Sequence, residues 1–428
     1  RSVCDALAER RLAREAIDRL AAHIKEADEL DLYRLQIRGL ARTWGIDERQ
    51  LLRVCLHATR LGLLEMSWDV VCPHCRGVRE ELGDISRIPS EGRCEVCEID
   101  FGTGDPNSIE ITFHVHPSVR AIPKQHFCSA EPASRAHIKV QRALEPGAEA
   151  ALQPRLPAGR YCLRLKGQEA LVLVDVDPEA EADRLRWAAP ALPEVVRLRP
   201  DPHLELVNEG DGPTTFVVEE SRWTDDALRP AHVLGDREFR DLYAEQYLAN
   251  DVQLAVGEQV ILFTDMVGST RFYSERGDAA AFVQVRDHFA ELTEIYDEAG
   301  GALIKTIGDA TMAAFAEPLA ALKAAQAIQR RFPDDRADSA IRLRISIHSG
   351  PCIAVTLHHV IDYFGGTVNA AAKLQACADA GQIAFSPAIR GAPGVEEFLA
   401  AERARLHEAP FESAAFDRPI TVTRWDVW

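Results

Sequence analysis

The sequence lacks any apolar run that approaches the roughly 20 residues needed to span a membrane as a helix. It also begins without the apolar core of a signal peptide, because Arg10, Arg11, Arg14 and Asp18 make that end charged. These two absences predict a cytoplasmic protein with no membrane partner. Since the first residue is Arg1 and not methionine, we expect a further N-terminal portion to precede it.

Basic residues are scarce relative to acidic ones. There are 49 Lys and Arg against 67 Asp and Glu, and the net charge is −18. This balance repels nucleic acid and anionic membranes, so a nucleic acid partner is disfavoured. Glycine (26) and proline (23) are too few for a collagen-like or largely disordered chain of 428 residues. At about 150 residues per domain, this length predicts two to four domains that need no disulfides to fold.

The ten cysteines fall into two groups. Four form the hooks Cys72-Pro-His-Cys75 and Cys94-Glu-Val-Cys97, separated by eighteen residues. This spacing predicts a zinc ribbon whose closed four-thiolate shell binds one structural Zn²⁺. His74 is an alternative ligand, whereas disulfides or redox sites need an oxidising compartment or a thioredoxin-like context that the sequence does not show. The remaining cysteines are expected to be reduced packing residues: Cys4, Cys55, Cys128, Cys162, Cys352 and Cys377.

Residues 1–66 predict a helical, winged-helix-like region. An amphipathic helix is expected over 1–30. From residue 32 the pattern predicts a helix, a turn at 44–47 and a second helix over 48–61. An extended segment then runs over 63–71, which completes the order of a small winged helix. Acidic and basic residues are nearly balanced here, which favours packing against protein over binding to DNA. A transcription regulator that uses this region and the following cysteine-containing segment remains the alternative that DNA binding would support.

Residues 67–125 are assigned to the zinc ribbon and 126–225 to a small antiparallel β-sandwich with a regulatory role. The ribbon ends in the alternating strand 109–116, on which His114 and His116 share a face without a third metal ligand nearby, so we interpret them as surface residues. Turns rich in Pro and Gly separate the strand-like runs of the sandwich. These runs are Tyr161–Leu165, Ala170–Val176, Leu204–Asn208 and Thr215–Glu220.

Residues 226–256 predict an amphipathic linker helix. Phe239, Leu242, Tyr243 and Tyr247 recur at helical spacing just before the next strand. Such a helix can transmit a signal from an input module to a following domain, or it can simply pack between them. The chemistry of a regulatory ligand or protein partner stays open.

Residues 257–428 contain the motifs that carry chemistry. The apolar strand 260–263 ends in Thr-Asp-Met-Val-Gly-Ser-Thr, so that Asp265 lies beside a turn whose N–H groups can hold phosphate. The segment 302–315 predicts a β-hairpin with Asp309 at its tip. Two aspartates on adjacent strands can bridge a pair of divalent ions.

A third segment, Asp-Tyr-Phe-Gly-Gly-Thr-Val-Asn from Asp362, opens a helix on which Asn369 and Lys373 share a face. With Phe-Thr-Asp-x-x-Gly-Ser-Thr, Lys-Thr-Ile-Gly-Asp and the intervening His348-Ser-Gly, this order resembles the class III adenylate/guanylate cyclase catalytic domain over about 257–390. The preceding ribbon and β region resemble the accessory part of a bacterial subgroup. The resemblance implies a multidomain α+β protein that ends in a ferredoxin-like class III cyclase fold.

The resemblance also implies roles for the motif residues. Asp265 and Asp309, with the Met266 carbonyl, would bind two Mg²⁺ or Mn²⁺ ions. Lys305 would donate to adenine N1 and Asp362 would accept from the 6-amino group, which favours ATP over GTP. Asn369 would orient the ribose and Lys373 would contact the phosphates. The backbone around five further residues would bind substrate phosphates: Phe263, Thr264, Gly268, Ser269 and Thr270.

In this family the metal ligands and the base readers come from opposite subunits, so one domain per chain implies a homodimer. The expected function is an adenylate cyclase that makes 3′,5′-cyclic AMP and pyrophosphate under control of the N-terminal modules. Two departures matter: Lys373 replaces an arginine, and Ser413-Ala414-Ala415-Phe416 has no lysine ahead of Phe-Asp. They leave open a pseudo-cyclase, a nucleotide-binding or dimerising module without turnover, and guanylate cyclase is a minor variant.

Overall fold

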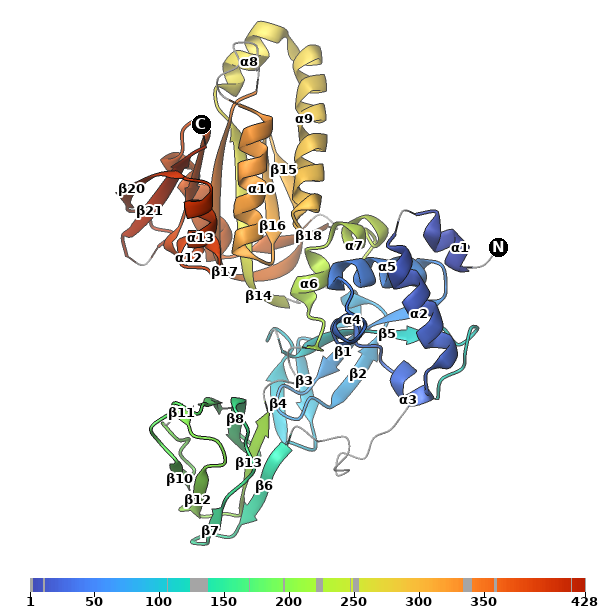
Figure 1. Cartoon of the computed structure of the whole chain (residues 1–428), viewed down its shortest axis with the longest axis vertical. Coiled ribbons are helices and arrows are strands. Elements are labelled where there is room, and N and C mark those ends of the chain that lie inside the picture. The colour runs from blue at the N-terminus through green and yellow to red at the C-terminus, as the bar shows by residue number, and fades with distance from the viewer. Residues whose placement is uncertain are drawn as a thin grey trace. The chain divides into compact units, whose positions relative to one another are not determined.

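The computed structural model describes residues 3–427 apart from 11, 106, 124–137, 169, 195–196, 221–225, 247, 249–253, 334–340, 358–359 and 417. The chain has a mixed α/β structure with two compact units, Arg1–Asp84 with Ile88–Leu228, and Arg229–Trp428 with Ile85–Arg87 (Figure 1). No helix among the described residues is both long and apolar enough to cross a membrane.

The first unit begins with helices α1 (Val3–Ala8), α2 (Arg14–Glu26), α3 (Glu29–Leu32), α4 (Ile37–Trp44) and α5 (Glu48–Arg60). The single helix expected over 1–30 is wrong, because the extended backbone of Ala13 separates α1 from α2. This break lets α1 pack against both α2 and α5, so that Leu7 and Ile17 are each buried. Periodicity reports which faces are apolar, and it does not report where the chain turns.

The turn between α4 and α5 forms as expected. Gly45 ends α4 with a left-handed φ of 68°, a conformation that glycine adopts without strain. Asp47 then caps α5, since its side chain accepts a hydrogen bond from the N–H of Gln50 at 2.9 Å. The extended segment that follows is β1 (Leu64–Val71), the central strand of an antiparallel sheet with the order β2 (Val78–Leu82), β1, β5 (Ile109–Val115).

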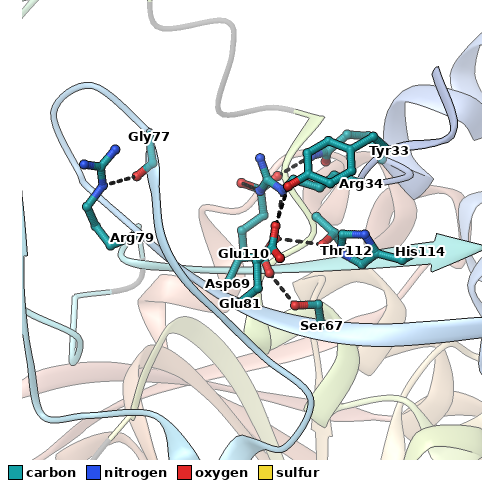
Figure 2. Close-up of polar contacts among 11 residues, drawn as sticks. Tyr33, Arg34, Ser67, Asp69, Gly77, Arg79, Glu81, Glu110, Thr112 and His114 are labelled. Atoms are coloured by element: carbon teal, nitrogen blue, oxygen red, sulfur yellow. Dashed lines mark hydrogen bonds and ion pairs between the residues drawn. The ribbon is translucent and has the colours of Figure 1, made fainter. Parts of the chain in front are cut away.

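A buried polar cluster joins the segment before α4 to this sheet (Figure 2). Arg34 has a left-handed φ of 56° and donates from Nε to Asp69 at 2.9 Å and from Nη2 to Glu110 at 3.2 Å. Ser67 and Thr112 also donate to Asp69, at 2.5 and 2.7 Å. Because Asp69 is 0% exposed and Glu110 is 5% exposed, one guanidinium is shared between two buried carboxylates.

The first cysteine hook lies in the turn between β1 and β2. The second lies at the turn of the short hairpin of β3 (Glu91–Cys94) and β4 (Ile99–Gly102), and the 3₁₀ turn Ile85–Arg87 precedes this hairpin. The β region follows as β6 (Ile138–Leu144), β7 (Glu149–Leu152), β8 (Gly159–Leu165), β9 (Leu171–Val176), β10 (Arg184–Ala189), β11 (Arg197–Leu198), β12 (His203–Asn208) and β13 (Thr214–Glu220). Its strands form two sheets, in the orders β11-β9-β8-β13-β6 and β10-β12-β7.

Both sheets of the β region contribute to one apolar core. Trp187 of β10 meets Phe216 of β13 edge to face, with ring centroids 4.9 Å apart. The expectation of purely antiparallel pairing is wrong, since β10 pairs with β12 and β11 with β9 in parallel. Local turn signals identify strands, whereas the partner of a strand is decided by packing across the core.

The second unit begins with α6 (Pro230–Leu234) and α7 (Arg237–Leu242). The continuous linker helix expected over 226–256 is therefore wrong. Gly235 ends α6, and Asp236 starts a new helix by accepting from the N–H of Glu238 at 2.8 Å. Tyr247, part of the predicted apolar face, lies outside the described residues.

The rest of the second unit comprises β14 (Leu254–Met266), α8 (Ser269–Arg276), α9 (Asp278–Glu298), β15 (Ala302–Ile307), β16 (Ala310–Phe315), α10 (Pro318–Arg331), β17 (Leu343–Leu357), β18 (Val360–Phe364), α11 (Gly366–Leu374), the 3₁₀ turn Gln375–Cys377, β19 (Gln382–Phe385), α12 (Pro387–Arg390), α13 (Val395–Ala401), β20 (Arg405–Phe411) and β21 (Ile420–Asp426). Within this unit the chain runs through strand β14, helices α8 and α9, strands β15 and β16, helix α10 and strand β17. These four strands lie in the sheet order β15-β16-β14-β17, and β14 is antiparallel to both of its neighbours. This is the ferredoxin-like arrangement that the resemblance implied.

Helices cover the two faces of this sheet unequally. Val260 and Leu262 of β14 share the main core with α9 and α10, which Figure 1 shows along one side of the sheet. A smaller cluster on α11, β19 and β21 includes Leu374 and Val422. The apolar run of β14 is thus buried on both faces, and its carboxyl end carries Asp265.

Candidate active site

Two aspartates lie at one end of the strand pair β14–β16. Thr264 pairs with Thr311 in the ladder, which places Asp265 at the end of β14 close to the hairpin turn that carries Asp309. The two threonine hydroxyls lie 2.7 Å apart, and the Tyr296 hydroxyl lies 2.6 Å from that of Thr311. This buried hydroxyl cluster supports the strands directly beneath the two carboxylates.

The two carboxylates have different surroundings. Oδ2 of Asp309 is buried and has no hydrogen-bond partner among the described residues. Oδ2 of Asp265 accepts from both Nε and Nη2 of Arg344 on the neighbouring strand, at 2.8 and 2.5 Å. An orphaned buried carboxylate oxygen beside a second carboxylate fits the oxygen ligands that Mg²⁺ and Mn²⁺ prefer. The Met266 carbonyl belongs to the same strand end, where Met266 pairs with Leu343.

Arg344 and His288 are site residues that the sequence analysis missed. A basic residue four positions before the His348-Ser-Gly motif, on the strand expected beside Asp265, was an available signal for Arg344. His288 of α9 is 2% exposed, and neither ring nitrogen has a partner among the described residues. Burial lowers the pKa of His288 to about 4, and the opposing charge of Asp309 only partly offsets this. His288 is therefore neutral at pH 7 and adds no cation to the site.

Lys305 of β15 and Asp362 of β18 form a second group. Lys305 Nζ donates to Oδ2 of Asp362 at 2.5 Å across 57 residues of sequence. Oδ1 of the same carboxylate accepts from the N–H of Tyr363 at 2.8 Å. Asp362 is 7% exposed and the Lys305 side chain is 37% exposed, so the pair places a fixed acceptor in a buried position beside a partly exposed donor.

The structure around the turn after β14 reduces the number of residues whose backbone is available to bind phosphate. Phe263 and Thr264 lie between β16 and β17, so their backbone belongs to the sheet, and the N–H of Val267 donates to Arg342 at 2.8 Å. Gly268 has a left-handed φ of 79° and is the residue before α8, which begins with Ser269 and Thr270. Of the five residues expected here, the last three occupy a helix N-terminus, where backbone N–H groups attract anions.

Asn369 and Lys373 are both exposed on α11, opposite its buried residues Ala370 and Leu374. Within the described part of the chain, no hydrogen bond or ion pair joins either of them to Asp265 or Asp309. The single chain thus brings together two pairs, Asp265 with Asp309 and Lys305 with Asp362. It leaves the ribose and phosphate candidates of α11 facing outward.

The four hook cysteines converge as their spacing predicted. The Sγ atoms of Cys72, Cys75, Cys94 and Cys97 lie within 4.8 Å of one another, and those of Cys75 and Cys94 are 3.7 Å apart. A tetrahedral zinc site with Zn–S bonds of about 2.3 Å requires sulfur separations of about 3.8 Å, so these residues fit a zinc ion. His74 is buried beside them and does not belong to this group of ligand atoms.

The remaining cysteines and histidines have ordinary surroundings. Cys55, Cys162 and Cys352 are buried free thiols, whereas Cys4 and Cys377 are only half-buried, contrary to expectation, and Cys128 lies outside the described residues. His114 packs edge to face on Tyr33 with ring centroids 5.6 Å apart, and His116 Nδ1 lies 2.7 Å from the Ser118 hydroxyl. Neither histidine belongs to a group of potential metal ligands among the described residues.

Comparison with known proteins shows which domains the second unit is similar to. Residues 253–406 match the family model described as adenylate and guanylate cyclase catalytic domain. Residues 3–135 match a second model, DUF5939, described as a family of unknown function.

Curated relatives match over the same region. "Adenylate cyclase 2" of Rhizobium meliloti (strain 1021) is 29% identical over 179 residues, which cover 38% of this chain and 45% of that protein. "Adenylate cyclase" of Mycosarcoma maydis is 28% identical over 187 residues, 38% of this chain and 7% of that protein. The chain therefore spans less than half the length of each of these relatives. Among solved structures, the adenylyl cyclase CyaB from P. aeruginosa aligns with a TM-score of 0.34 at 17% identity, over 41% of this chain and 95% of that one.

Proposed function

We propose that the protein is an adenylate cyclase that converts ATP into 3′,5′-cyclic AMP and pyrophosphate. The observation that carries this proposal is the Lys305–Asp362 pair, within a domain of the cyclase family. A lysine donor matches N1 of adenine and a carboxylate acceptor matches its 6-amino group, while guanine presents a donor and an acceptor in the opposite order. GTP is therefore the disfavoured substrate.

Asp265, Asp309 and the Met266 carbonyl would hold two divalent ions in this reaction. When bound, such ions lower the pKa of the 3′-hydroxyl and neutralise charge on the triphosphate. Arg344 holds the Asp265 carboxylate in place, and the N-terminus of α8 offers N–H groups to phosphate oxygens. Asn369 would orient the ribose and Lys373 would contact the phosphates. In-line attack on the α-phosphorus then depends mainly on positioning and charge neutralisation.

A homodimer would complete the site. Asn369 and Lys373 face outward from α11, so a second copy can supply them to Asp265 and Asp309. Large apolar side chains of the second unit are also exposed, and burying them would favour association. They are Phe282 at 67%, Val283 at 44%, Ile307 at 49%, Val360 at 53% and Phe364 at 61% exposure.

The N-terminal modules would carry the regulation. The four cysteines would hold one structural Zn²⁺, which stabilises the fold around β3 and β4 and leaves no open position for catalysis. We assign 1–66 to a winged-helix-like region, 67–125 to a zinc ribbon, 126–225 to a regulatory β domain and 257–428 to the cyclase domain. We also propose that the protein is located in the cytoplasm.

A pseudo-cyclase is the second candidate. It is favoured by Lys373, which lacks the forked guanidinium of the family's arginine, and by Ala414 and Ala415, where a lysine is expected. The purified full chain should therefore be assayed with ATP or GTP, in Mg²⁺ and in Mn²⁺, beside Asp309→Asn. Cyclic AMP that disappears in the variant supports the adenylate cyclase. A folded, dimeric wild type that binds ATP and forms no product supports the pseudo-cyclase.

A further inference from the structure

Arg240 of α7 connects the segment before the cyclase domain to the strand that carries Asp362. Its Nη2 donates to the carbonyl of Ile361 at 2.6 Å, across 121 residues of sequence. Its Nη1 donates to the carbonyl of Leu234, at the end of α6, at 3.1 Å. The half-buried guanidinium thus joins two backbone carbonyls, and the described residues place no carboxylate within ion-pair distance of it.

The carbonyl of Ile361 belongs to the peptide bond that leads into Asp362. Strand β18 pairs only with β17 among the described strands, where Val355 is opposite Asp362. Its other edge therefore has no ladder to hold it. A charged donor on this carbonyl fixes the peptide plane, and so the backbone from which the Asp362 carboxylate reaches Lys305.

A second contact and the local charges support the same role. A Cβ on Gly235, between α6 and α7, would lie 3.7 Å from the hydroxyl of Tyr363, so the chain passes close to β18 there as well. Burial lowers the pKa of Arg240, and the negative charges of Asp362 and Asp241 oppose this effect. The guanidinium therefore contributes a poorly solvated positive charge close to the base-reading carboxylate.

We propose that Arg240 is a positioning residue that sets the place of Asp362 and thereby the preference for adenine. The proposal rests on the adenylate cyclase function proposed above. Arg240 lies outside residues 253–406, so the segment before the matched domain contributes to substrate selection. Displacement of α6–α7 would then weaken base recognition without altering any residue that touches the metals.

The test compares Arg240→Met, which keeps the aliphatic length and loses both donor nitrogens, with Arg240→Lys, which keeps the charge and a single donor nitrogen. Arg237→Gln is the matched control, because Arg237 lies on the same helix and its contacts are with Asp241 and Asp297. We expect Arg240→Met to raise KM for ATP about tenfold and to reduce the ATP-to-GTP ratio of kcat/KM by a similar factor, since Asp362 then loses its fixed place. Arg240→Lys should recover part of both effects, and Arg237→Gln should leave both within about twofold.

A fall in kcat alone, with KM and the nucleotide ratio unchanged, overturns the proposal and assigns Arg240 a purely structural role. Hydrogen exchange of the backbone over Val360–Phe364 in the full chain tests the positioning role of Arg240 without relying on cyclase activity. Arg240→Met should accelerate exchange there about tenfold and Arg237→Gln should not. If the wild type makes no cyclic nucleotide, the adenylate cyclase function fails while this difference in exchange still supports the positioning. Equal exchange in wild type and Arg240→Met overturns it, and a thermal scan of both variants confirms that they fold.

Discussion

Asp265 and Asp309 are chemically identical residues in opposite electrostatic situations. Asp265 is paired with Arg344, while a buried oxygen of Asp309 has no partner among the described residues. A buried unpaired carboxylate lowers stability, and a paired one is neutral or favourable. The site thus keeps one ligand that is held in place and one that gains most from a bound cation.

Neutral amides at these two positions should have opposite effects on stability. In the metal-free protein, Asp309→Asn is expected to raise the unfolding free energy by about 1 kcal/mol, because an uncompensated charge is removed. Asp265→Asn is expected to lower it by roughly 1 kcal/mol, because Arg344 loses its partner. Urea unfolding with excess chelator measures both. Turnover should fall at least about 100-fold in each variant, and equal signs of the two stability changes would contradict the assignment.

His288 predicts a pH dependence of stability. Its pKa is about 4 in the folded chain because of burial, against about 6.5 when unfolded. Between these values the unfolded state binds more protons, so the unfolding free energy falls as the pH falls from 6.5 to 4. The loss is expected to reach about 3 kcal/mol, and His288→Leu should remove that part of the slope. Urea titrations at pH 6.5, 5.5 and 4.5 measure it, and an unchanged slope in the variant would refute this account.

At the scale of elements, Arg34 joins the segment before α4 to β1 and β5 through Asp69 and Glu110 (Figure 2). Arg34→Met leaves two buried carboxylates without their cation and should cost about 3 kcal/mol of unfolding free energy. Arg38→Met is the control, because Arg38 makes a more exposed pair with Glu48 and should cost less than about 1 kcal/mol. Urea unfolding measures both variants. Similar losses of unfolding free energy in the two would show that the buried ion pairs of Arg34 stabilise the fold no more than the exposed pair of Arg38.

The stability of the fold around the two cysteine hooks should depend on a bound metal ion. The purified chain is expected to contain one Zn²⁺, and Cys94→Ser should lose it and unfold at a lower temperature, since metal binding and folding are coupled. Cys162→Ser serves as control, because Cys162 is also buried and lies outside the group of four. Elemental analysis with thermal scans measures both. Zinc retained in Cys94→Ser, or lost equally in the control, would exclude the four-cysteine site.

At the scale of the whole molecule, the exposed apolar side chains of the second unit predict self-association. Phe364 is 61% exposed at the end of β18, next to the helix that carries Asn369. Phe364→Glu is expected to shift the chain to monomer and to remove turnover, because in the proposed homodimer each site would use α11 of a second copy. Leu173→Glu is the control, since Leu173 is 48% exposed in the first unit. Sedimentation velocity checks this, and a dimer that survives Phe364→Glu would place the interface elsewhere.

Much of the candidate site could be predicted because its signals are local. The cysteine hooks, the Gly308-Asp309 turn and the strand that ends at Asp265 each depend on a few adjacent residues whose backbone conformation follows from their own chemistry. The ferredoxin-like order of β14 to β17 was correct as well, because the motifs occur in the order of that fold. The predicted helices over 1–30 and 226–256 failed at Ala13 and Gly235, since helical periodicity gives no position for a break.

The sequence by itself therefore determined which chemical groups the protein presents: two metal-type carboxylates, one lysine–carboxylate pair and four thiolates. Only the tertiary structure decided which side chains hold these groups in place. Arg344 reaches Asp265 across 79 residues, and Arg240 reaches the peptide before Asp362 across 121. Such contacts depend on strand register, where a shift of one residue turns every side chain to the other face, and register is fixed only when the whole core packs.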